Sequence, residues 1–123
     1  MSAADLDVAT RFLDALAVAA TTGEHDVLYP LLAEDVEWLT PKRELAGLDA
    51  VRSDLTWVTP PHNLDLEFEL AEVVDAGGGH VVTDVHETYR VKGSGDFAYA
   101  CDRRIDLTIA GERVVRYEMR VIG

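Results

Sequence analysis

The fold is decided by the stretch Leu64-Asp65-Leu66-Glu67-Phe68-Glu69-Leu70, in which apolar and acidic residues alternate. Successive side chains of a β-strand point to opposite faces of the sheet, so this alternation predicts a half-buried strand. Three further strands are expected at residues 80–91, 97–109 and 113–122, because Gly-containing turns separate these stretches. Four consecutive strands joined by short turns predict an antiparallel meander.

Before residue 64 the apolar residues recur at helical spacing instead. Residues 5–20 carry one apolar stripe and predict an amphipathic helix. Two shorter helices are expected, one within 26–33, where Pro30 disturbs the pattern, and one at 48–58. A short strand is expected at 35–40. Helices followed by a run of strands predict an α+β fold.

Length and composition fit one domain that covers residues 1–123. The net charge is −12, and most of the acids lie in residues 1–75, so the chain should repel phosphate backbones and we expect no nucleic-acid partner. The longest apolar stretch, residues 15–20, is far shorter than the ~20 residues of a membrane span. Cys101 is the only cysteine and the acidic N-terminus does not resemble a signal peptide, so we expect a cytoplasmic protein.

Two charged residues interrupt apolar strand faces. Glu87 falls on the apolar face of the strand at 80–91, and Arg103 falls on that of the strand at 97–109. A buried charge is costly unless it has a partner or a water-filled cavity. Because the two strands are neighbours in the meander, Glu87 and Arg103 can reach each other. The pair is either the acid and cation of a pocket or an internal salt bridge, and the sequence leaves both possibilities open.

The order of elements resembles that of the nuclear-transport-factor-2-like superfamily, which includes ketosteroid isomerases, SnoaL-like polyketide cyclases and limonene epoxide hydrolases. The stretches that carry the resemblance are Arg11-Phe12-Leu13-Asp14-Ala15-Leu16, Leu31-Leu32-Ala33-Glu34-Asp35-Val36-Glu37-Trp38, Leu45-Ala46-Gly47-Leu48-Asp49-Ala50-Val51 and Ala110-Gly111-Glu112-Arg113-Val114-Val115. The resemblance implies a cone-shaped, cystatin-like barrel. In it, three N-terminal helices pack in the concave face of a curved, mostly antiparallel sheet and leave an apolar pocket for a small-molecule ligand.

The functional residues of these families are only partly present. The catalytic positions of ketosteroid isomerases fall on Thr40, Phe12 and near Arg103, so the resemblance does not imply steroid isomerisation. The acid on the second meander strand of limonene epoxide hydrolases matches Glu87, whereas Val85 replaces their arginine. The resemblance therefore implies acid–base chemistry at Glu87 on an oxygen-bearing metabolite, by epoxide opening, cyclisation or isomerisation. The rival hypothesis is a non-catalytic domain that binds a ligand or only dimerises.

The candidate ligand-lining residues lie on expected inner faces or at family positions, and they could equally form ordinary core. They are Phe12, Trp38, Thr40, Trp57, Tyr99, Cys101, Tyr117 and Met119. No cofactor is expected, because no Gly-rich phosphate loop or Cys-x-x-Cys pair is present. No metal is expected either. His80, Asp84 and His86 share a strand face, but we expect that face to be exposed and see no further ligand near it.

The outer face of the meander carries charges of both signs. The arginines are Arg90, Arg104, Arg116 and Arg120, and the acids are Asp84, Asp102, Asp106 and Glu118. Such a mosaic suits a self-complementary two-fold contact, and members of the superfamily often dimerise through the convex sheet face. We therefore expect a homodimer, with a solvated face of cross-strand ion pairs as the alternative.

Overall fold

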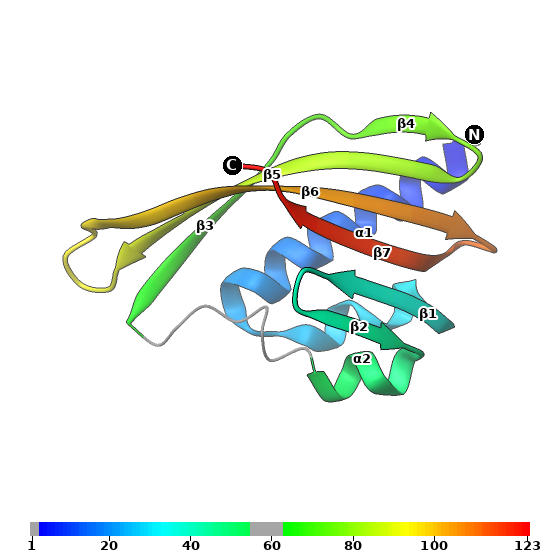
Figure 1. Ribbon diagram of the computed structural model, residues 1–123, viewed down its shortest axis with the longest axis horizontal. Helices are drawn as coiled ribbons and strands as arrows, with labels where there is room; N and C mark the ends of the chain where they lie inside the picture. The colour runs from blue at the N-terminus through cyan, green and yellow to red at the C-terminus, as the bar shows by residue number, and fades with distance from the viewer. Residues whose placement is uncertain (1–2, 55–62) are drawn as a thin grey trace.

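The computed structural model describes residues 3–54 and 63–123 and confirms the α+β class (Figure 1). The helices are α1 (Ala3–Thr22), the 3-10 helices η1 (His25–Val27) and η2 (Tyr29–Leu31), and α2 (Leu48–Asp54). The strands are β1 (Leu32–Thr40), β2 (Arg43–Ala46), β3 (Leu64–Leu70), β4 (Val74–Gly77), β5 (His80–Val91), β6 (Phe97–Ala110) and β7 (Arg113–Val121).

The strands form one curved sheet in the order β2-β1-β7-β6-β5-β3, with β4 also paired to β5. The predicted antiparallel meander is confirmed in β3, β5, β6 and β7. Strand β1 joins it by pairing parallel to β7 and antiparallel to β2. The expected barrel does not close, because β2 has only 4 residues and pairs only with β1 among the described strands.

The long helix α1 forms because its apolar residues make a continuous stripe that packs against β3, β6 and β7. Phe12, Leu13 and Leu16 in this stripe are at most 3% exposed. Figure 1 shows α1 running across one face of the sheet. The core therefore lies between α1 and that face.

The register of β5 and β6 places the two unusual charges side by side. Val85 is opposite Arg103, and Glu87 is opposite Cys101. Positions two residues apart on a strand share a face, so Glu87 and Arg103 are diagonal neighbours on the side that faces α1.

The helix expected within residues 26–33 differs from the prediction in form. It is present as the 3-10 helices η1 and η2, and the amide of Leu28 donates to the carbonyl of His25 while the amide of Leu31 donates to the carbonyl of Leu28. Pro30 has no amide hydrogen and stands in the first turn of η2, where none is needed. Strand β1 then begins at Leu32, three residues before its predicted start.

The helix expected at 48–58 is present as α2 over Leu48–Asp54, and the remainder of that range, with Trp57, lies outside the described residues. Strands β2 and β4 were not predicted. Of the helices that the structure describes, none combines the length and apolar character needed to cross a bilayer.

Candidate functional site

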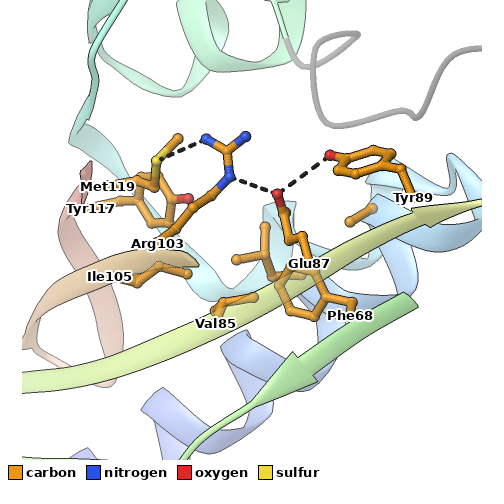
Figure 2. A pocket seen from close by; sticks show the side chains of 10 residues that line it. Phe68, Val85, Glu87, Tyr89, Arg103, Ile105, Tyr117 and Met119 are labelled. Atoms are coloured by element: carbon orange, nitrogen blue, oxygen red, sulfur yellow. Dashed lines mark hydrogen bonds and ion pairs between the residues drawn. The ribbon is translucent and has the colours of Figure 1, made fainter. Parts of the chain in front are cut away.

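A small cavity lies between α1 and the sheet, in the region where Glu87 and Arg103 meet (Figure 2). The residues that line it are Leu16, Ala20, Phe68, Val85, Glu87, Tyr89, Arg103, Ile105, Tyr117 and Met119. Its volume is about 70 Å³. Water in the liquid occupies about 30 Å³ per molecule, and ligand pockets usually measure about 300–1,000 Å³. The cavity therefore has room for a few heavy atoms, such as one end of a metabolite.

The central contact of the cavity is a hydrogen-bonded ion pair between neighbouring strands. The Nε of Arg103 donates to Oε1 of Glu87 at 2.6 Å. The Glu87 side chain is 9% exposed and the Arg103 side chain is 26% exposed. Charge-assisted hydrogen bonds of this length are among the stronger polar contacts in proteins, and partial burial limits their screening by water.

The two oxygens of Glu87 have different surroundings. Oε1 also accepts from the Tyr89 hydroxyl at 3.3 Å and, weakly, from the Cys101 thiol at 3.5 Å. Oε2 receives no hydrogen bond from any residue in the described ranges 3–54 and 63–123. One carboxylate oxygen therefore holds the ion pair in place, and the other has no partner among the described residues.

The two terminal nitrogens of Arg103 have a weak partner or none among the described residues. Its Nη1 donates to the Met119 sulfur at 3.4 Å, and a thioether is a weak acceptor. Nη2 has no hydrogen-bond partner among the described residues. Figure 2 shows the guanidinium between Met119 and Glu87, with Tyr89 on the other side of the carboxylate.

Burial and the Glu87 charge keep the surrounding groups protonated. Burial, followed by the Glu87 charge, raises the pKa of both Tyr89 and Tyr117. Burial also raises the pKa of the Cys101 thiol. For Arg103, burial acts to lower the pKa, but the Glu87 carboxylate outweighs it and the net shift is upward. At neutral pH these four groups are therefore hydrogen-bond donors arranged around one carboxylate.

The Tyr117 hydroxyl is a third group without a hydrogen-bond partner among the described residues, after Oε2 of Glu87 and Nη2 of Arg103. Tyr117 is 2% exposed and lines the cavity, and its ring stacks on Trp38 with a centroid distance of 3.9 Å. No hydrogen bond joins its hydroxyl to another residue in the described part of the chain. Buried tyrosine hydroxyls usually find a hydrogen-bond partner, so this one is exceptional among the described residues.

The structure brings four of the predicted site residues together around this cavity: Glu87, Arg103, Tyr117 and Met119. Cys101 contacts Glu87 from the neighbouring strand but does not line the cavity among the described residues.

Four further predicted site residues that the structure describes lie elsewhere. Phe12 and Trp38 are 0% exposed and belong to the core, where their rings pack edge to face at 6.2 Å. Tyr99 is 46% exposed and stacks on Tyr89 with a centroid distance of 4.4 Å. Thr40 lines a separate groove at the end of β1. These positions form the surroundings of the cavity rather than its wall.

Sequence reasoning missed several wall residues, of which Tyr89 matters most because it binds Glu87 directly. Tyr89 lies two residues after Glu87 on the same strand face, so strand alternation was a sufficient signal for it. Leu16 and Ala20 reach the cavity from α1, and no local pattern distinguishes them from other residues of the apolar stripe.

On the outer face of the sheet, polar and charged side chains pair with one another. Asp84 accepts from Arg104 at 2.9 Å, His86 contacts Asp102 at 2.6 Å, and His80 contacts Thr108. Within the described residues, no three His, Cys, Asp or Glu side chains gather as metal ligands would.

Comparison with solved structures finds the same architecture in proteins with little sequence similarity to this chain. A nuclear-transport-factor-2-like protein from Anabaena variabilis matches with a TM-score of 0.79 and 16% identity, over 100% of this chain and 93% of that one. TerC, co-crystallised with polyporic acid, matches with a TM-score of 0.71 and 16% identity, over 98% and 92% of the two chains.

A third structure, of a protein from Catenulispora acidiphila with a ketosteroid-isomerase-like fold in complex with trimethylamine, matches with a TM-score of 0.67 and 16% identity, over 88% and 82% of the chains. No protein-family model and no curated protein matches this sequence. The similarity therefore establishes the nuclear-transport-factor-2-like fold, which the order of elements predicted.

Proposed function

We propose that the cavity binds the oxygen-bearing end of a small metabolite and that Glu87 performs acid–base chemistry on it. The observation that carries this proposal is a pair of unused polar groups on an otherwise mostly apolar wall. These are Oε2 of Glu87 and the hydroxyl of Tyr117, neither of which has a hydrogen-bond partner among the described residues. Two proteins of the same fold were crystallised with small organic molecules, which is consistent with this use of the fold.

In this proposal Oε2 of Glu87 takes a proton from the bound ligand or returns one to it. The Tyr117 hydroxyl and Nη2 of Arg103, which has no partner among the described residues, donate hydrogen bonds to the oxygen on which negative charge develops. The same groups suit epoxide opening, cyclisation or isomerisation, since each reaction moves a proton near a developing oxyanion. Because the volume is about 70 Å³, only the reacting end of the ligand enters the cavity.

The second candidate function is a non-catalytic ligand-binding or dimerisation domain. It is favoured by the 2.6 Å bond between Arg103 and Glu87, because two charges that satisfy each other need no ligand. The two candidates differ in one respect that can be measured. A catalytic Glu87 must exchange protons with a bound molecule, whereas a structural Glu87 need not.

Deuterium exchange provides that measurement without knowledge of the natural substrate. Small enolisable ketones in D₂O are followed by proton NMR for loss of the α-proton signal, and a parallel set of small epoxides is followed for ring opening. The wild-type protein should accelerate at least one of these reactions, and Glu87→Gln should reduce the rate at least about 100-fold because a general base is lost. Ketone binding, measured by saturation transfer, should persist in this variant.

Glu69→Gln is the matched control, because Glu69 is an exposed glutamate on the adjacent strand β3. It should leave the rate unchanged. Full turnover by Glu87→Gln would contradict the catalytic role, and binding of the ketones without turnover by any variant would favour the second candidate.

We also propose that the chain forms a homodimer through the sheet face opposite α1. A shallow groove on that face combines the ion pairs Arg104–Asp84 and Arg120–Asp106 with Val74, which is 52% exposed. Light scattering coupled to gel filtration should give twice the chain mass, and Val74→Glu should shift it toward the monomer. A monomeric wild type at all concentrations would contradict this assembly.

A further inference from the structure

A second hollow adjoins the cavity at the β1–β2 turn. This outer groove has a volume of about 370 Å³ and is lined by Thr40, Pro41, Lys42, Arg43, Arg103, Met119 and Val121. Arg103 and Met119 also line the inner cavity, so the two spaces share these side chains as a common wall. A ligand whose reacting end fills the cavity would extend past Arg103 into the outer groove.

The described lining of the outer groove is cationic, in a chain whose net charge is −12. It includes three basic residues and no acidic one. Arg43 is neutralised by Asp54 at 2.9 Å, and Arg103 by Glu87 at 2.6 Å. Lys42 is exposed and has no ion pair with any described residue. The groove therefore carries about one uncompensated positive charge.

The free donors point to the geometry of the anion that would bind. Nη2 of Arg103 lacks a partner among the described residues, and the exposed Lys42 contributes an ammonium to the lining of the same groove. A guanidinium edge with an ammonium suits a planar carboxylate. One uncompensated positive charge balances a monoanion better than a phosphate dianion.

We propose that the outer groove is a carboxylate subsite, so that the ligand is an apolar acid with its reacting oxygen in the cavity and its carboxylate on Lys42 and Arg103. This inference rests on the proposed function, because it assumes that the cavity is occupied. It adds the substrate class, a monocarboxylate, to a site otherwise defined only by its reacting group.

The test compares a keto acid with its neutral amide, 4-oxopentanoate against 4-oxopentanamide, in protein-observed NMR titrations at low salt. The wild type should bind the acid about fivefold more tightly than the amide, the size of effect that one partly exposed charge supplies. The preference should fall as salt is added. Lys42→Gln should reduce the preference to less than about twofold.

Lys92→Gln is the matched control, because Lys92 is the only other lysine and is exposed in the turn after β5. It makes the same change in net charge and should preserve the preference. Equal binding of acid and amide by the wild type, or an undiminished preference in Lys42→Gln, would overturn the carboxylate subsite while the cavity proposal stands. If neither probe binds, the proposed function itself fails and the subsite fails with it.

Discussion

Removing either charge of the Glu87–Arg103 pair should destabilise the protein, and removing both should cost less than the sum of the two single changes. Arg103→Met keeps an apolar stem of similar length but leaves the Glu87 carboxylate, which is 9% exposed, without its cation. Glu87→Gln leaves Arg103, which is 26% exposed and can turn toward water more readily. We therefore expect Arg103→Met to be the more harmful change.

The expected coupling free energy follows from the distance between the two charges and from their burial. Charges about 4 Å apart attract by about 4 kcal/mol at an effective dielectric constant of about 20. Desolvation offsets part of this, and exposed pairs contribute about 1 kcal/mol or less. For a pair buried to this degree we expect a coupling free energy of about 2 kcal/mol. Arg103→Met alone should lower the free energy of unfolding by about 3 kcal/mol, the lower end for a stranded buried charge.

Urea unfolding of the wild type, both single variants and the double variant forms a double-mutant cycle that isolates this coupling. Far-UV circular dichroism at neutral pH follows the transition. A coupling below about 0.5 kcal/mol, the level of a solvated surface pair, would refute the argument from burial. Equal effects of the two single variants would refute the expected asymmetry.

Two further predictions concern the rest of the sheet. The hydrogen bond to Asp102 raises the pKa of His86 above its ordinary value of 6.5. The contribution of this pair to stability should therefore be complete below pH 6.5 and should be lost as pH rises through the higher folded-state pKa. His86→Gln should flatten this part of the stability–pH curve, measured by urea titrations. A Cβ on Gly79 would lie 2.5 Å from the carbonyl oxygen of Ile109 at a φ of +81°, so Gly79→Ala should lower the free energy of unfolding by about 3 kcal/mol. Gly77→Ala, at a similar φ with open space, should cost only about 1 kcal/mol, and equal costs would show that the close contact relaxes.

Alternation predicted which face of a strand each side chain occupies, but not how deeply it is buried. Ile105 and Tyr99 share a face of β6, yet Ile105 is 2% exposed and Tyr99 is 46% exposed. Phe97, two residues before Tyr99 at the start of β6, is 62% exposed. Figure 1 shows the paired ends of β5 and β6 extending beyond α1 near the turn that joins them. Burial depends on what packs against each part of the strand, which is tertiary information that alternation lacks.

The missed strands have a different cause. Both β2 and β4 have 4 residues, too few for an alternating pattern to stand out. They pair because β1 and β5 present free edges to them. For the site, Glu87 and Arg103 could be predicted to meet because two charges on apolar faces need each other. The small volume of the cavity could not be predicted from the sequence, since it depends on how the neighbouring side chains fill the space under α1.

The parallel pairing of β1 with β7 has a consequence for how the chain folds. Trp38 pairs with Tyr117, about 80 residues later in the sequence, so β7 completes the sheet by inserting between β1 and β6. Its pairing with β6 is local, across a short turn, whereas its pairing with β1 closes a long loop and is entropically slow. Folding should therefore be limited by the docking of β7, and the partly folded chain before that step is the species most exposed to aggregation.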